Sequence, residues 1–138
     1  MTLVLTAPTA INHPRLRTAG ALIAGFLTVA ILSTAADAVL HAMNYYPNDG
    51  TAGSDPELAF ALTYRTLFTV LGGLITAWLA PSHPLRLAII LGAIGTLPAV
   101  LGVVAMWGLG HHWYAISLAV LAAPSTALGG WLFTRITR

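Results

Sequence analysis

Residues 87–107 have the sequence LAIILGAIGTLPAVLGVVAMW, which contains no charged side chain. A helix needs roughly 20 consecutive apolar residues to cross a bilayer, and this stretch is long enough. Three other stretches of the chain are apolar over a similar length. The sequence therefore predicts four transmembrane spans, at about residues 18–43, 58–80, 85–107 and 113–135.

The composition of the whole chain agrees with this reading. Of its 138 residues, 57% are hydrophobic and only 7% are charged, whereas a soluble domain carries roughly 25% charged residues. These values exclude a soluble globular domain, a disordered chain and a nucleic-acid binder with a basic surface. We predict an all-α membrane protein in which residues 1–138 form one domain, a four-transmembrane-helix bundle.

The placement of charge predicts how the bundle is oriented. The longest connection is residues 44–57, NYYPNDGTAGSDPE, which is rich in turn-forming residues. The acidic residues of this connection are Asp49, Asp55 and Glu57. The arginines that flank the spans on the other side are Arg15, Arg17, Arg86, Arg135 and Arg138. The positive-inside rule therefore places both termini in the cytoplasm and loop 44–57 outside.

The start of the chain also has features of a secretory signal peptide. Two arginines precede the apolar residues 19–32, and Ala36-Asp37-Ala38 has the form of a cleavage site. The apolar stretch continues to Met43, however, which is longer than the apolar region of a signal peptide. We therefore expect this stretch to remain as the first span.

Small residues recur at helical spacing in the spans. In the third span they are Ala88, Gly92, Gly95, Ala99 and Gly102. Small residues allow helix backbones to approach closely in lipid, so we expect this face to pack against other helices in a compact bundle. TVLGG at 69–73 also recurs as TALGG at 126–130. We interpret this as chance in a chain rich in Gly and Leu, with a duplicated hairpin as the alternative.

Two charged residues lie inside predicted spans, Asp37 in the first and Arg65 in the second. Both are roughly 10 Å below the outer ends of their helices, at 1.5 Å per residue. An unpaired charge costs at least a few kcal/mol in a bilayer, so we expect the two residues to form an ion pair. The pair either fixes two helices together or forms a functional centre.

Further polar residues surround this predicted pair. His41 lies one turn from Asp37 on the same helix face, Tyr64 precedes Arg65, and Glu57 lies two turns before Arg65. The candidate functional residues are therefore Asp37, His41, Glu57, Tyr64 and Arg65.

The same region offers weak candidates for metal binding. His41, His111 and His112 all lie near the outer side, but no metal-binding motif includes them. Cysteine is absent, and Ser33 is too far along its helix from His41 for a catalytic triad. We expect no catalytic residues and no cofactor.

The motifs of the chain resemble those of a widespread set of uncharacterised small bacterial inner-membrane proteins with four predicted helices. The matching elements are Asp37-Ala-Val-Leu-His41, Tyr64-Arg65, Gly72-Gly73 with Ala77, Ala80-Pro81, and Gly110 with Trp113-Tyr114. The resemblance covers most of the chain from residue 20 onward. It implies four spans in a bacterial inner membrane, and it names no substrate.

Three functions remain open at this level. The first is non-catalytic helix–helix association in the lipid bilayer, as a homo-oligomer or as an accessory subunit of a larger membrane protein. The second is a small ion-coupled or multidrug-type transporter, since the small multidrug-resistance transporters also have four helices and a carboxylate in the first. The third is an outer-side His/Asp metal site. Association is favoured, and a cavity that reaches Asp37 would favour transport.

Overall fold

The structure is a computed structural model that describes residues 13–138. Residues 1–12, with the amino terminus that was predicted to be cytoplasmic, lie outside the described residues. The described chain forms five helices and no strand: α1 (Pro14–Ala42), α2 (Asp55–Leu79), α3 (Pro84–Met106), the short η1 (Trp107–Leu109) and α4 (His112–Ile136). The four α-helices are long and apolar enough to cross a membrane. The prediction of an all-helical protein with four membrane-length helices is confirmed for the described residues.

The helices begin one to four residues before the predicted spans, because proline and polar residues start them. Pro14, Pro56 and Pro84 lie in the first turns of α1, α2 and α3, where the missing N–H of proline has no cost. The Glu57 carboxylate accepts a hydrogen bond of 2.7 Å from the backbone N–H of Ser54, which caps α2.

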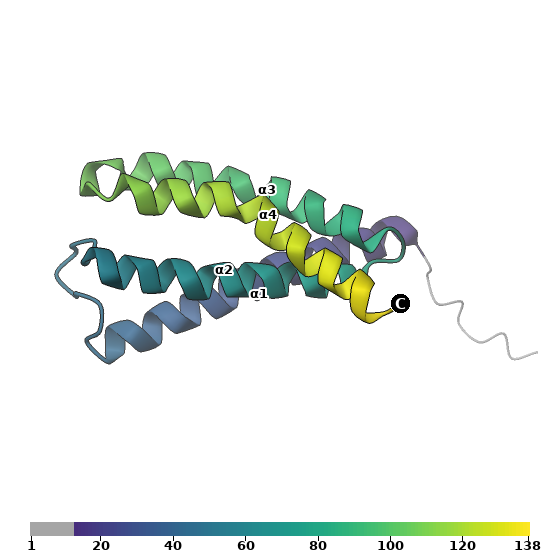
Figure 1. The fold of residues 1–138 in the computed structure, drawn as a ribbon, viewed down its shortest axis with the longest axis horizontal. Coiled ribbons are helices and arrows are strands. Elements are labelled where there is room, and N and C mark those ends of the chain that lie inside the picture. Colours follow the sequence, from purple (N-terminus) through teal and green to yellow (C-terminus); the bar gives the residue numbers. More distant parts are fainter. Residues whose placement is uncertain (1–12) are drawn as a thin grey trace, which may run out of the picture.

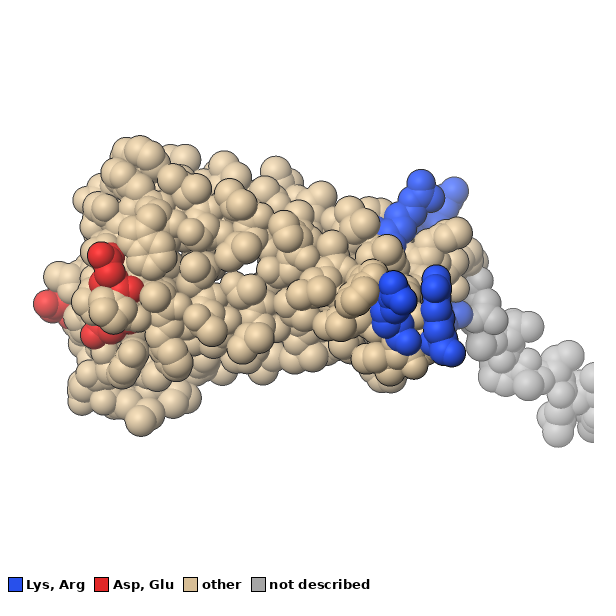
Figure 2. All heavy atoms as spheres, viewed as in Figure 1, with Lys and Arg blue, Asp and Glu red and all other residues tan. Residues whose placement is uncertain are grey.

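Charge divides the molecule into two ends (Figure 2). The visible arginines gather at one end, and the visible acidic side chains gather at the opposite end. We call these the arginine end and the acidic end. The arginine end carries Arg15, Arg17, Arg86 and Arg135, and the acidic end carries Asp49, Asp55 and Glu57.

The helices meet most closely where α2 crosses α4. A Cβ atom added to Gly73 would lie 2.7 Å from the Cα of Thr126, and one added to Gly129 would lie 2.6 Å from the backbone nitrogen of Leu74. Real Cβ atoms do not approach other atoms this closely, so only glycine allows the two backbones to touch. The crossing joins the repeated segments TVLGG and TALGG.

The second glycine of each pair contacts a different helix. A Cβ atom on Gly72 would collide with α1 at Gly25, and one on Gly130 would collide with α3 at Ala88. Neighbouring residues of an α-helix point about 100° apart, since the helix has 3.6 residues per turn. Each Gly-Gly pair therefore brings two other helices close to its own, and all four helices are joined by backbone contacts in this region.

Helix α1 is the least enclosed of the four. Its buried residues are Ala21 and Gly25, both toward the arginine end. There the hydroxyl of Thr76, which is fully buried, donates to the carbonyl of Ala21 at 3.2 Å. Figure 1 shows α1 and α2 crossing near this end and separating toward the acidic end.

The small-residue face of α3 is only partly used for packing. Ala88 and Gly92 are buried, and a Cβ atom on Gly92 would collide with Ala123 and Thr126 of α4. Gly95 and Gly102 have nothing within 4 Å of an added Cβ atom. Within this chain, therefore, only part of the small-residue face packs against helices, and these two glycines remain open. They lie beyond the Gly-Gly crossings, where the helices no longer meet so closely.

Candidate functional site

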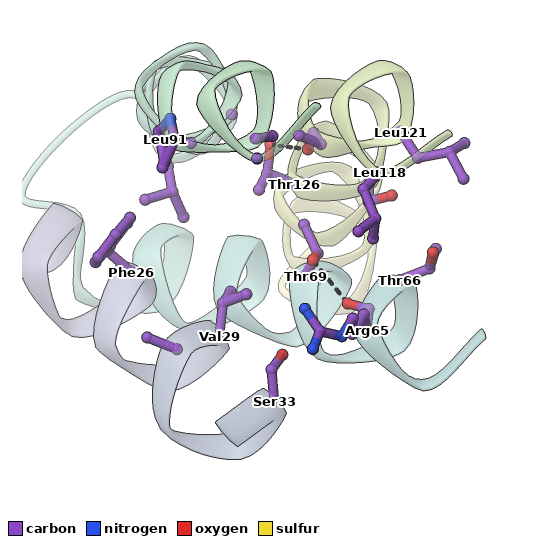
Figure 3. A pocket seen from close by; sticks show the side chains of 18 of the residues that line it. Phe26, Val29, Ser33, Arg65, Thr66, Thr69, Leu91, Leu118, Leu121 and Thr126 are labelled. Carbon is purple, nitrogen blue, oxygen red and sulfur yellow. Dashed lines mark hydrogen bonds between the residues drawn. The ribbon is translucent and has the colours of Figure 1, made fainter. Parts of the chain in front are cut away.

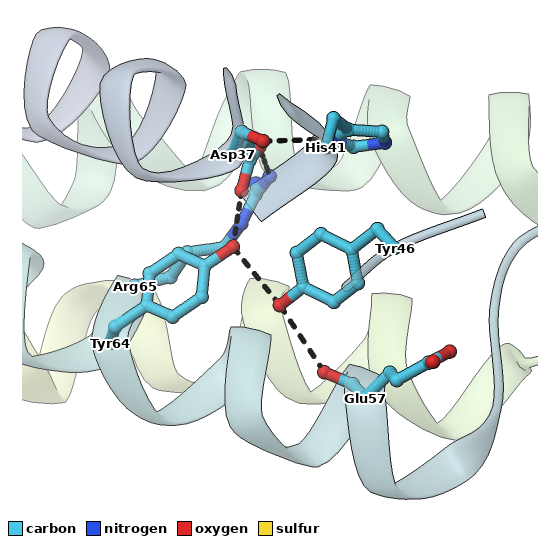
Figure 4. Close-up of polar contacts among 6 residues, drawn as sticks. All are labelled: Asp37, His41, Tyr46, Glu57, Tyr64 and Arg65. Carbon is cyan, nitrogen blue, oxygen red and sulfur yellow. Dashed lines mark hydrogen bonds and ion pairs between the residues drawn. The ribbon is translucent and has the colours of Figure 1, made fainter. Parts of the chain in front are cut away.

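Asp37 is the centre of a polar cluster between α1 and α2 (Figure 4). Its Oδ2 atom is in contact with the Arg65 Nη2 atom, and its Oδ1 atom accepts a hydrogen bond from the Tyr64 hydroxyl. Both oxygens of the carboxylate are thus engaged by α2. The charge of Asp37 is balanced by the guanidinium, which removes most of the cost of placing either ion among apolar helices.

Tyr46, in the connection between α1 and α2, extends this cluster toward the acidic end. Its hydroxyl lies 3.3 Å from the Tyr64 hydroxyl and 3.4 Å from the Glu57 carbonyl, and its single proton is shared between these acceptors. Burial raises the pKa of Tyr46 above its ordinary range, so the hydroxyl stays protonated as a donor. A chain of hydrogen bonds therefore runs from Glu57 through both tyrosines to Asp37.

His41 and Glu57 make no side-chain hydrogen bond to the other side chains of the cluster among the described contacts, although the His41 ring packs against Tyr46. The Nδ1 atom of His41 hydrogen-bonds the backbone carbonyl of Asp37 at 2.8 Å, so this ring is bound to its own helix. The Glu57 carboxylate caps α2 and leaves only its carbonyl for Tyr46. Of the five residues predicted for the site, Asp37, Tyr64 and Arg65 are the three whose side chains meet.

The structure separates the other histidines from Asp37. His111 donates from Nδ1 to the Asp55 carboxylate at 2.9 Å, and Trp113 donates to the same oxygen at 3.0 Å. His112 stacks on Trp107 with ring centroids 3.9 Å apart. Residues 13–138 contain no cluster of three or more His, Cys, Asp or Glu side chains placed for a metal ion. His41, His111 and His112 are thus used in three different contacts.

A cavity of about 390 Å³ lies beside the Asp37–Arg65 pair, and all four long helices line it (Figure 3). α1 and α2 contribute polar groups to its wall: Ser33, Thr34, Asp37, Arg65, Thr66 and Thr69. α3 contributes small residues and a proline: Gly92, Gly95, Pro98, Ala99 and Gly102. The two glycines left open by the packing of α3 therefore face this cavity.

The charged pair is partly accessible in this arrangement. The side chains of Arg65 and Asp37 are 32% and 27% exposed, respectively. The Nε atom of Arg65, in contrast, is buried and has no hydrogen-bond acceptor among the described residues. A buried donor without an acceptor is rare in folded proteins, so this guanidinium carries one unsatisfied N–H group among the described contacts.

Two features of the site were not predicted from the sequence. The first is the contact of Asp55 with His111 and Trp113, which joins the starts of α2 and α4. In the sequence, this contact could have been inferred from Asp55 and His111, an acid and a histidine that both lie near helix starts at the same end of the bundle. The second is the cavity, because spacing alone does not distinguish small residues that touch a helix from small residues that leave space.

The comparisons with known proteins add no relative to this geometry. The chain matches no protein-family model, no curated protein and no solved structure at a significant level.

Proposed function

We propose that the protein is a small multi-pass transporter whose binding site is the cavity beside Asp37 and Arg65. The observation that supports this function is the cavity itself. It is lined by all four long helices, and it reaches two charged side chains at membrane depth. Its volume of about 390 Å³ falls within the range of small-molecule sites, roughly 300–1,000 Å³.

The packing supports access of a ligand to the cavity from the acidic end. Toward the arginine end, the glycine contacts of α1, α2, α3 and α4 leave no room even for a Cβ atom. The cavity lies on the acidic side of these contacts, along the part of α3 that contains Gly95 and Gly102. A transporter in an outward-open state has this arrangement, with a closed inner end and an open site near the middle of the membrane.

The orientation and the membrane belong to the same proposal. The positive-inside rule places the arginine end, with the carboxyl terminus, in the cytoplasm and the acidic end outside. We propose a cytoplasmic amino terminus as well, because Arg15 and Arg17 lie at the start of α1. We propose the inner membrane of a bacterium as its location, which the resemblance of its motifs to those of small four-helix proteins supports.

Cysteine accessibility tests transport without a known substrate. The chain has no cysteine, so Gly95→Cys and Leu97→Cys each provide a single reporter. Gly95 lines the cavity, whereas Leu97 is 68% exposed and lies outside the cavity lining. Thiolates form in water, so a membrane-impermeant thiosulfonate should modify Gly95→Cys at least about tenfold faster than Leu97→Cys.

The sidedness of this reaction decides between transport and a static site. A transporter that alternates exposes Gly95→Cys in both right-side-out and inside-out vesicles. Modification from the outer side alone would contradict transport, and no modification at all would show that water does not enter the cavity.

Helix association is the second candidate function, and the open glycines of α3 favour it. A small-residue face that its own bundle leaves unfilled can accept a helix from a second copy or from a larger membrane-protein partner. Native mass spectrometry of gently extracted protein would then show an oligomer or a heteromeric complex of defined mass. Gly95→Leu and Gly102→Leu together should return it to the monomer mass, and a monomer in the unmodified protein would contradict association.

A further inference from the structure

The carboxylate in the cavity is already satisfied. Asp37 accepts from the Tyr64 hydroxyl at Oδ1 and is paired with Arg65 at Oδ2, so neither oxygen lacks a partner (Figure 4). The guanidinium also cancels its charge at contact distance. A cation that entered the cavity would find no free counter-charge, and it would lose its hydration there without compensation.

The guanidinium of Arg65, in contrast, has donors beyond its contact with Asp37. A guanidinium offers five N–H groups and no acceptor. In Arg65, Nη2 donates to Asp37, and the side chain remains 32% exposed beside the cavity. The guanidinium lies at the α2 wall and points toward α1 near Ser33 (Figure 3). An acceptor oxygen of a ligand can bind to the exposed part of this guanidinium.

The rest of the cavity is apolar. Its wall away from the charged pair is formed by Phe26, Val29, Leu91, Leu118 and Leu121. These side chains surround the space between the helices in Figure 3. A ligand that fits both parts has a hydrocarbon portion along this wall and one acceptor oxygen at Arg65.

We propose that the cavity binds a neutral amphiphile, a molecule with a hydrocarbon chain and a carbonyl oxygen that accepts hydrogen bonds from Arg65. This inference rests on the proposed function and names the class of its ligand. A neutral head group keeps the balanced Asp37–Arg65 pair electrically neutral, whereas an anionic or a cationic head group would add a net charge inside the membrane. The site therefore differs in selectivity from one in which a free carboxylate binds cations.

Photolabelling with matched probes tests the ligand class. The probe is a twelve-carbon methyl ketone with a diazirine at its far end, added to vesicles that contain the full chain. Labelled residues are mapped by mass spectrometry. Dodecan-2-one at about ten times its Kd should lower the labelling of cavity residues about tenfold. Dodecanoate and dodecyltrimethylammonium, which have chains of similar length, should leave the labelling unchanged.

Two variants connect the binding to its residues. The combined Asp37→Leu and Arg65→Met variant replaces the ion pair by apolar groups, a change that folds tolerate better than the loss of one partner. It should remove the ketone-sensitive labelling while keeping the helix content measured by circular dichroism. The control Asp49→Asn, in the connection at the acidic end, should label like the unmodified protein.

Each outcome bears on the ligand class separately from transport. Competition by the ammonium or the carboxylate that equals competition by the ketone would overturn the neutral-amphiphile proposal. Labelling spread evenly over the outer helix faces, insensitive to any competitor, would overturn it as well. Ketone-sensitive labelling of the cavity together with one-sided cysteine modification would retain the ligand class and remove transport.

Discussion

Alanine at Gly73 is expected to destabilise the protein, and alanine at Gly95 is expected to stabilise it. Both substitutions add one methyl group to an α-helix, where alanine is favoured over glycine by about 1 kcal/mol. At Gly95 the new methyl group meets open space, so this gain is realised. At Gly73 it would collide with the Thr126 backbone, and separating α2 from α4 costs at least about 2 kcal/mol more than the gain.

The measurement is the free energy of unfolding in mixed micelles, followed by circular dichroism as denaturing detergent is added. Because the two variants are chemically identical changes, detergent affinity and helix propensity cancel in the comparison. Equal shifts for Gly73→Ala and Gly95→Ala would show that the close contact of α2 and α4 does not hold the bundle together.

The second large effect is expected at the ion pair. Asp37→Asn leaves the Arg65 guanidinium without its counter-charge, and Arg65→Met leaves the carboxylate without its own. Each change should lower the free energy of unfolding by about 2 kcal/mol, which is less than the roughly 3–5 kcal/mol for fully buried pairs because this pair is partly exposed. Combining both substitutions should cost less than the sum, since no unpaired ion remains.

The same unfolding assay measures this coupling. Asp49→Asn provides the control, because Asp49 is exposed and its oxygen accepts hydrogen bonds only from Thr51 among the described contacts. It should change stability by less than about 0.5 kcal/mol. Additive losses at Asp37 and Arg65 would mean that their contact contributes nothing to stability.

The number of long helices could be predicted because apolar length depends on local sequence. Their starts lie one to four residues before the predicted spans, because helices begin at proline and polar residues such as Pro14 that apolar length does not detect. The nearness of Asp37 and Arg65 was also predictable, since sequential antiparallel helices place residues of equal depth side by side. The cost of an unpaired charge then leaves few other arrangements.

The cavity and the histidine contacts could not be predicted, because they depend on how the helices cross. Gly92 and Gly95 are three residues apart on one face of α3, yet one touches α4 and the other faces open space. That difference is set by how α3 packs against α4, which no single helix encodes. The connection at the acidic end likewise contains several acidic residues that could pair with His111, and only the fold determines that the partner is Asp55.

The position of the glycine contact on α1 determines how that helix can tilt. Gly25 contacts α2 without a side chain of its own, so we take this contact as the pivot about which α1 can tilt. Asp37 lies 12 residues further along (37 − 25), which places it about 18 Å from the pivot at 1.5 Å per residue. A swing of about 10° would move it about 3 Å, roughly the length of one hydrogen bond. A small tilt of α1 at Gly25 would therefore separate Asp37 from Arg65, and the ion pair between them opposes that tilt.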